Sequence, residues 1–320
     1  MNNNFPNLLI AGTGAMACMF SARFAAIGVE VTHLGTWDEG LEALQRRGVC
    51  IVEPTGIERS YQVRITRDPQ TCLGTRLALV LVKSWQTERV AHQLINCLHP
   101  QGLVLTLQNG LGNDTVLADA LGPERVAFGV TTTGATLLAP GRVKPVGDGT
   151  IMLGNHPRLR PLKDLMQMAG FRIETVLDTT SLLWGKLVIN SAINPLTALL
   201  KVYNGELLER PEARDLMAQI TLETAAVAKR RAITLPYENP VKVVEGVAQR
   251  TAKNCSSMLS DILRGRPTEI DAINGAVVHL GEEVGIPTPI NRILWQLVRA
   301  LERSSTAVEV NMNSMVVPIC

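Results

Sequence analysis

Hydrophobic and polar positions follow two different patterns along this chain of 320 residues. In the first half, short apolar runs alternate with longer segments whose apolar residues recur every three or four positions. The predicted strands lie at 8–11, 29–34, 77–82 and 103–107, and the segments with helical spacing at 15–27, 38–47, 86–98 and 113–121. Buried strands that alternate with amphipathic helices are typical of βα units on a mainly parallel sheet. The first half is therefore predicted to be an α/β domain.

Parts of the first half, and all of the second, depart from this alternation. Residues 49–66 hold two β-rich segments around a proline-glycine turn and predict an inserted hairpin. Residues 125–154, rich in β-branched residues and turns, predict a more antiparallel edge of the sheet. After a strand-like run at 171–176, long amphipathic helices occupy the rest of the chain. We predict two domains, an α/β domain at 1–177 and an all-helical domain at 178–320.

A glycine-rich turn, Gly12-x-Gly14-x-x-Ala17, follows the first apolar run and opens the first predicted helix. The first glycine permits a tight turn, and the second lets the backbone approach a pyrophosphate that the N–H groups of the helix N-terminus stabilise. A tight turn that binds nothing is the alternative, but the strand and helix around it favour a dinucleotide site. The residues predicted to bind the cofactor here are Gly12, Thr13, Gly14, Ala15 and Met16.

Three other predicted strands end in polar residues, where an open α/β sheet collects its ligands. After the second strand, neither an acidic residue for a ribose hydroxyl nor an arginine for a 2′-phosphate stands at the strand end. Thr36 is able to hydrogen-bond a phosphate there, while Asp38 is interpreted as the N-cap of the next helix. Lys83 and Asn109 follow the next two strands and are expected to meet cofactor or substrate, or else to satisfy loop backbone.

Lys186, Asn190 and Asn194 recur at i, i+4 and i+8 in an otherwise apolar segment and so share one helix face. An unpaired polar group costs about 1–3 kcal/mol to bury, which favours a face that meets a ligand over a solvated stripe. A lysine is protonated at pH 7 and can donate to the alkoxide that forms when hydride adds to a ketone.

A second acidic motif lies at 266–271, Arg-Pro-Thr-Glu-Ile-Asp. Thr268 followed by Asp271, with Pro267 before them, predicts a capping box at a helix start. That interpretation leaves Glu269 without a structural role. Its carboxylate is then a candidate to accept hydrogen bonds from a substrate hydroxyl.

Composition narrows the class of protein. With 46% hydrophobic residues, 19% charged residues and a net charge of +2, the chain has no global attraction for nucleic acid or an anionic membrane. Six cysteines without a CxxC pair and five histidines without an HExxH motif predict no metal site. No basic leader and no long apolar span are present, which predicts a cytoplasmic protein without a membrane segment.

Taken in order, these motifs closely resemble the ketopantoate reductase (2-dehydropantoate 2-reductase) family over nearly the whole chain. The matching segments are 12–17, 82–87, 107–110, 184–198, 204–207, 256–258 and 268–271. The resemblance implies an N-terminal Rossmann domain that binds NADP and a helical domain that binds substrate and carries the catalytic residues. It implies a monomer or homodimer that reduces 2-dehydropantoate to (R)-pantoate with NADPH, a step of pantothenate and coenzyme A biosynthesis.

Motif matches also imply roles for individual residues. Lys186 is expected to be the general acid that protonates the ketone oxygen, and Glu269 to hold the substrate's terminal hydroxyl or to support the lysine. Lys83 is expected on the cofactor side of the site, and Asn109 to contact both cofactor and substrate. The remaining residues expected to bind substrate are Asn190, Asn194, Asn204 and Ser257.

Two points stay open at the level of sequence. Family members that prefer NADPH often carry an arginine where this chain has Thr36, so NADP is the predicted cofactor and NAD, or use of both, the alternative. The substrate is a small 2-oxo acid, and a different 2-oxo acid is the second reading because fold does not fix substrate. A non-catalytic dinucleotide-binding protein is the third, and the presence of both Lys186 and Glu269 argues against it.

Overall fold

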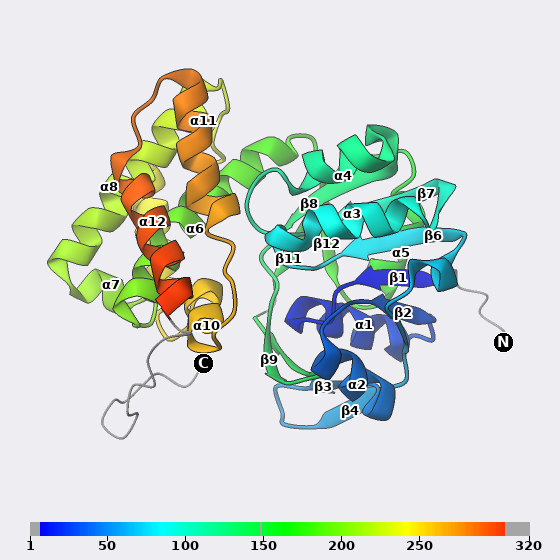
Figure 1. Ribbon diagram of the computed structural model, residues 1–320. Helices are drawn as coiled ribbons and strands as arrows, with labels where there is room; N and C mark the ends of the chain where they lie inside the picture. The colour runs from blue at the N-terminus through cyan, green and yellow to red at the C-terminus, as the bar shows by residue number, and fades with distance from the viewer. Residues whose placement is uncertain (1–6, 148, 305–320) are drawn as a thin grey trace. The chain divides into compact units, whose positions relative to one another are not determined.

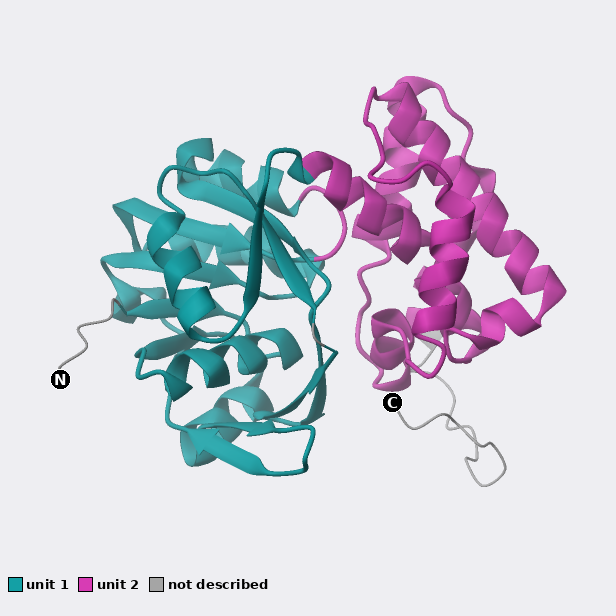
Figure 2. Cartoon of the chain, turned by 180° about the vertical axis from the view of Figure 1, so that it is seen from behind, with its two compact units in different colours: residues 1–108, 113–179 teal, residues 109–112, 180–320 magenta. Residues whose placement is uncertain are grey.

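The computed structural model describes residues 7–147 and 149–304. The chain forms two compact units, shown in different colours in Figure 2. Unit 1 comprises Met1–Gln108 and Asn113–Thr179, and unit 2 comprises Asn109–Gly112 and Thr180–Cys320. A four-residue loop from the first half of the sequence therefore belongs to the second unit. The division into an NADP-binding domain at 1–177 and a substrate-binding and catalytic domain at 178–320 stays a prediction.

Unit 1 is built on an eight-stranded sheet whose strands run in the order β12-β11-β8-β7-β6-β1-β2-β5. Neighbouring strands are parallel except for β11 and β8, which confirms the predicted α/β fold and its antiparallel edge. The strands are β1 Leu8–Ala11, β2 Val31–Leu34, β5 Arg64–Thr66, β6 Thr75–Val80, β7 Leu98–Thr106, β8 Val126–Thr131, β11 Thr150–Gly154 and β12 Arg172–Val176.

Helices cover both faces of this sheet, and β1 shows why. Successive side chains of a strand point to opposite faces. Leu8 and Ile10 pack into one hydrophobic cluster with helices α1 and α5, while Leu9 and Ala11 pack into another with α3 and α4. A strand buried on both faces reads as a continuous apolar run, as it does here. The helices are α1 Ala15–Ala26, α2 Asp38–Arg47, α3 Thr87–Ile95, α4 Asn113–Leu121 and α5 Arg160–Met168.

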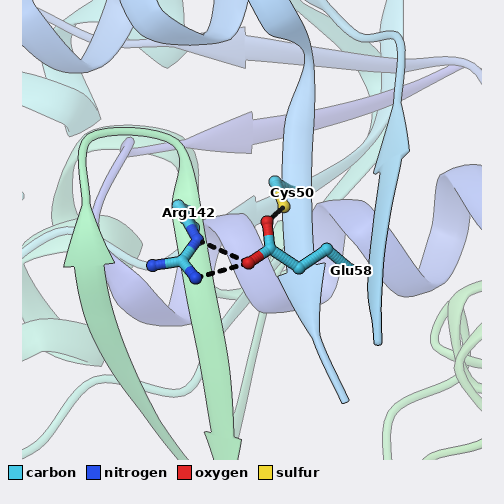
Figure 3. Close-up of polar contacts among 3 residues, drawn as sticks. All are labelled: Cys50, Glu58 and Arg142. Carbon is cyan, nitrogen blue, oxygen red and sulfur yellow. Dashed lines mark hydrogen bonds and ion pairs between the residues drawn. The ribbon is translucent and has the colours of Figure 1, made fainter. Parts of the chain in front are cut away.

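A second, four-stranded sheet contains the predicted hairpin. Its order is β4-β3-β10-β9, with β3 Val49–Val52 and β4 Glu58–Tyr61 antiparallel, and with β9 Gly134–Ala139 and β10 Arg142–Val146 joining beside β3. Figure 3 shows a polar cluster that links three of these strands. Arg142 Nε donates to Glu58 Oε1 at 3.2 Å and the Cys50 thiol to Glu58 Oε2 at 3.4 Å. The guanidinium lowers the pKa of the exposed Glu58 carboxyl, so the cluster keeps its ion pair near neutral pH.

Unit 2 contains helices and loops but no strand among its described residues, as predicted, and one of its two apolar clusters gathers between α6, α8 and α9. A short π-helix, η4, precedes α11. No helix within the described residues is both long and apolar enough to span a membrane. The helices are α6 Thr179–Leu200, α7 Glu206–Glu209, α8 Pro211–Arg230, α9 Pro240–Arg250, α10 Ser257–Leu263, η4 Asp271–Gly275, α11 Ala276–Val284 and α12 Pro289–Ser304.

The capping box predicted for 268–271 was wrong. Thr268 Oγ1 accepts from the Ile270 N–H at 3.1 Å, and the Thr268 N–H donates to Glu302 Oε1 at 2.6 Å. Asp271 begins the π-helix and accepts a hydrogen bond from Trp295 Nε1 at 2.6 Å. Both long-range partners come from α12, so a tertiary contact took the groups that a local cap would have used.

Candidate active site

The glycine-rich turn of unit 1 has the backbone that only glycine adopts readily. Gly12 has φ +123°, and a Cβ there would lie 3.2 Å from the backbone carbonyl carbon and oxygen of Leu81. A larger residue would force the turn away from the neighbouring chain. The turn is thus held close to the sheet at the carboxyl end of β1.

Gly14 has a different geometry. It is the N-cap of α1 and has extended backbone, and a Cβ built on it would meet no heavy atom of the described residues within 4 Å apart from its two chain neighbours. No side chain of the described residues caps α1, and its first turn contains no acidic residue. The first N–H groups of a helix without such partners suit an anionic ligand. The open space and the uncapped helix end fit the pyrophosphate of a dinucleotide.

His33 of β2 contacts the glycine turn, a role that was not predicted from the sequence. Its side chain is fully buried, and its Nδ1 lies 2.8 Å from the Gly12 carbonyl oxygen. Burial lowers the pKa of His33 to about 4, so the ring is neutral at pH 7 and carries its proton on Nδ1 to donate to that oxygen. The signal in the sequence was a histidine within a predicted buried strand that follows the glycine turn.

The region where a ribose would be read contains an arginine that sequence reasoning also missed. Thr36 is exposed after β2, as expected. Arg67 follows β5, which pairs in parallel with β2, and it forms an ion pair with Asp38. Asp38 is the first residue of α2 and not its N-cap, which is Trp37, so the N-cap prediction was wrong. The strand before Arg67 is only three residues long, which hid its position in the sequence.

Lys83 lies three residues beyond the end of β6, because that strand ends at Val80 and not at the predicted Val82. It is half-buried and is the N-cap residue of a short 3-10 helix at Ser84–Gln86. Gln108 fixes this loop, since its Nε2 donates to the Val82 carbonyl at 3.0 Å and to Thr87 Oγ1 at 2.8 Å. The side chain at 83 thus stands on a loop held by hydrogen bonds.

Asn109 belongs to the loop that unit 2 takes from the first half of the chain. The Leu111 N–H donates to the Ala272 carbonyl at 2.9 Å, and Gly110, at φ +80°, passes too close to Ala272 to carry a Cβ. Asn109 Nδ2 then donates to Glu269 Oε2 at 3.2 Å. Two candidate residues separated by 160 positions are therefore brought into contact.

Lys186 and Glu269 are two charged residues of unit 2 that interact electrostatically. Glu269 is buried and Lys186 is half-buried on α6. Burial lowers the pKa of Lys186 to about 8, while the negative charge of Glu269 acts in the opposite direction and raises it. The ammonium is thus mostly protonated at pH 7 but gives up its proton more readily than a surface lysine. Such a group suits general acid catalysis.

The other polar candidates of unit 2 have individual surroundings. On α6, Asn190 is half-buried and Asn194 is buried, so the polar face predicted for this helix does not lie open to solvent. Asn204 Nδ2 donates to Thr251 Oγ1 at 2.9 Å, whereas its buried Oδ1 has no hydrogen-bond partner among the described residues. Ser257 is exposed at the start of α10. The substrate-binding roles of these residues stay predictions.

Comparisons with known proteins agree with this geometry. The family described as "Ketopantoate reductase PanE/ApbA" matches residues 8–158, and "Ketopantoate reductase PanE/ApbA C terminal" matches residues 178–302. A 2-dehydropantoate 2-reductase of Archaeoglobus fulgidus is 35% identical over 300 residues, which are 92% of this chain and 97% of that protein. One from Vibrio cholerae is 32% identical over 302 residues, 93% of this chain and 98% of its own.

Solved structures give the same result. A PanE/ApbA family ketopantoate reductase from Ralstonia eutropha superposes with a TM-score of 0.87 at 29% identity, covering 94% of this chain and 99% of that one. D-mandelate dehydrogenase with NADH and anilino(oxo)acetate gives a TM-score of 0.88 at 27% identity, with the same coverage. The chain belongs to the ketopantoate reductase family, which confirms the predicted membership.

Proposed function

We propose that this protein is a 2-dehydropantoate 2-reductase that uses NADPH to form (R)-pantoate for pantothenate and coenzyme A biosynthesis. The observation that carries the proposal is the Lys186–Glu269 pair, in which burial lowers the pKa of the lysine to about 8. Relatives that align over more than nine-tenths of the chain are named for this reaction. The proposed enzyme is cytoplasmic and either a monomer or a homodimer, which analytical ultracentrifugation distinguishes.

The proposed acid is Lys186. NADPH, held at the glycine turn of Gly12 and Gly14, would supply the hydride for the ketone carbon, and the carbonyl oxygen would then need a proton. The Lys186 ammonium donates a proton to that oxygen, which yields the 2-hydroxy acid. The neutral amine that remains regains a proton from solvent. A donor with a pKa near the working pH is well matched to this transfer.

Glu269 is proposed to support the lysine or to hold the substrate's terminal hydroxyl. Its negative charge raises the pKa of Lys186 and so opposes the effect of burial. Asn109 Nδ2 orients the carboxylate through its hydrogen bond to Oε2. Asn190, Asn194, Asn204 and Ser257 are proposed to bind the substrate's carboxylate and hydroxyl groups; the unpaired Oδ1 of Asn204 suits a hydroxyl donor.

Preference for NADPH is proposed on two side chains of unit 1. Thr36 follows β2, and Arg67 follows β5, the parallel neighbour of β2. The hydroxyl and the guanidinium thus lie at the sheet edge where the 2′-phosphate of a bound dinucleotide is read. Asp38 partly neutralises Arg67, which favours a smaller preference than an unpaired arginine would give. Gly12, Thr13, Gly14, Ala15, Met16 and Lys83 are proposed to bind the rest of the cofactor.

Initial-rate kinetics test the proposal. Purified protein is expected to oxidise NADPH only when 2-dehydropantoate is present, with a higher kcat/KM for NADPH than for NADH. Pantoate with NADP should run the reverse reaction and serves as a control for side reactions of the keto acid. Cofactor binding without turnover on any 2-oxo acid would instead indicate a non-catalytic binding protein.

A second candidate function is NADH-dependent reduction of another 2-oxo acid. The structural similarity to D-mandelate dehydrogenase bound to NADH, together with Thr36 and Asp38, favours it. A panel of 2-oxo acids that includes phenylglyoxylate, assayed with both cofactors, separates the two. A larger kcat/KM for another acid than for 2-dehydropantoate would replace the first proposal with the second.

A further inference from the structure

Helix α6, which carries Lys186, Asn190 and Asn194, contains a proline in its interior, Pro195. Proline has no N–H, so it cannot donate to the carbonyl four residues earlier, which belongs to Ser191. Ser191 is completely buried, and a buried carbonyl without a donor is costly. The structure fills the position with a side chain: Asn274 Nδ2 donates to the Ser191 carbonyl oxygen at 3.0 Å.

The orientation of the Asn274 amide is set by a chain of hydrogen bonds that starts at a carboxylate. Glu223 Oε2 accepts from Asn291 Nδ2 at 2.8 Å, and an ionised carboxylate has no hydrogen to donate. The Oδ1 of Asn291 must therefore point the other way, where it accepts from Asn274 Nδ2 at 2.9 Å. Both oxygens next to Asn274, Asn291 Oδ1 and the Ser191 carbonyl, require its NH2 group and exclude the flipped amide.

Asn274 lies in the π-helix η4, which begins two residues after Glu269. The Ile273 N–H donates to the Glu269 carbonyl at 3.1 Å, and the Gly275 N–H reaches back five residues to the Ile270 carbonyl at 3.0 Å. π-helical turns are rare and often occur at functional sites. The buried amide of Asn274 thus connects the segment of Glu269 to the helix of Lys186. Asn274 lies five residues after Glu269, and its partner Ser191 lies five residues after Lys186.

We propose that Asn274 is a positioning residue, which binds the carbonyl that Pro195 leaves open and thereby fixes the separation of Lys186 and Glu269. Glu223 and Asn291 fix the amide, so residues of α8 and α12 control the separation of Lys186 and Glu269. The kinetic consequences rest on the proposed function, whereas the pairing of Asn274 with the proline gap does not.

The pairing is tested by a double-mutant cycle with Asn274→Ala and Pro195→Ala. In Pro195→Ala the new backbone N–H donates to Ser191, so removal of the amide leaves no unpaired carbonyl. Asn274→Ala is expected to lower Tm by about 3–8 °C in the natural background and by clearly less in the Pro195→Ala background. Equal losses in both backgrounds would overturn the pairing. If Asn274→Ala alone fails to fold, a folded double variant supports the pairing, and a double variant that also fails overturns it.

The positioning role is tested by kinetics at a temperature where each variant is folded. Asn274→Ala is expected to lower kcat about 10-fold in both backgrounds, because the clamp is lost in each, while KM for NADPH stays within about twofold. Thr221→Ala is the matched control: Thr221 is also fully buried in unit 2, and its hydroxyl donates to the Met217 carbonyl within its own helix, α8. It should lose stability without losing kcat.

A pH profile separates positioning from a general loss of structure. Glu269 is the charged group whose field raises the pKa of Lys186, so a displaced Glu269 lowers that pKa. The basic limb of kcat should move to lower pH in Asn274→Ala and stay in place in Thr221→Ala. An unchanged kcat and basic limb in folded Asn274→Ala would overturn the positioning role. If the natural protein reduces a different 2-oxo acid, only the proposed substrate is refuted. The comparison of Asn274→Ala with Thr221→Ala is then made with that acid.

Discussion

The glycine turn of unit 1 and the charged pair of unit 2 are built in opposite ways. The geometry of the turn depends on its backbone and on the absence of side chains at two glycines. Gly12 lets the chain lie against Leu81, and Gly14 leaves open space at the N-terminal end of α1. The pair depends on side chains that come from segments far apart, since Glu269 contacts Asn109 and acts electrostatically on Lys186. A local motif is thus sufficient for the first site, whereas the second exists only after unit 2 has folded.

The largest effect is expected at the proposed acid. Lys186→Ala should lower kcat by about 10²–10⁴, because the proposed proton donor to the alkoxide is lost, while the affinity for NADPH stays close to that of the natural protein. Stopped-flow single-turnover assays and a binding titration measure the two quantities. Lys229→Ala, an exposed lysine at the end of α8, is the control and should change neither. Unaltered turnover in Lys186→Ala would remove this residue from the mechanism.

The two glycines provide a matched pair of substitutions in unit 1. Gly14→Ala should keep Tm within about 2 °C but weaken NADPH binding roughly 100-fold, since its Cβ occupies open space proposed for the pyrophosphate. Gly12→Ala should lower Tm as well, because its φ of +123° and its contact with Leu81 disfavour any side chain. Calorimetric titration and thermal denaturation measure both. Normal NADPH affinity in Gly14→Ala would show that the pyrophosphate lies elsewhere.

A smaller effect is expected at the ribose. Arg67→Ala should lower kcat/KM for NADPH about 10-fold, the loss of one charge-assisted hydrogen bond, and leave kcat/KM for NADH within about twofold. Asp38→Asn should act in the opposite direction, because it releases Arg67 from its ion pair. The ratio of the two specificity constants is the measurement. If Arg67→Ala changes both cofactors equally, the arginine does not distinguish them.

The smallest effect at neutral pH is expected from Glu269→Gln. Burial already lowers the pKa of Lys186 to about 8, and the neutral amide removes the charge that opposes this shift. The pKa of the lysine should therefore fall further, and the basic limb of kcat should move below pH 8. The loss of kcat should then be greater at pH 9 than at pH 6. A basic limb that stays in place in a folded variant would disconnect Glu269 from Lys186.

Several elements were predictable because the forces that form them act within a few residues. The helices at 38–47 and 113–121 were predicted to the residue, since an apolar stripe of period 3.6 and its flanking turns are local features. The hairpin of β3 and β4 was predicted from two β-rich segments around a turn. The order of the motifs along the chain then identified the family, because motif types and their order can be recognised without a structure.

The partners of individual polar groups were not predictable in this way. The capping box at Thr268 gave way to Glu302 and Trp295 of α12, and the cap expected at Asp38 gave way to Arg67. Glu302, Trp295 and Arg67 all lie more than 20 residues from the groups that they contact. A hydrogen bond forms with whichever suitable group lies closest in space, and that distance is set by the packing of whole helices and strands.

The sequence by itself therefore determined the α/β and helical halves, the glycine turn, the family and the types of residue available for chemistry. Only the tertiary structure decided that the loop of Asn109 belongs to unit 2, that Glu269 faces that asparagine, and that Asn274 closes the gap left by Pro195. The spacing of apolar residues is a property of neighbouring residues and can be recognised in the sequence. The burial that lowers the pKa of Lys186 comes from segments that meet only when unit 2 folds.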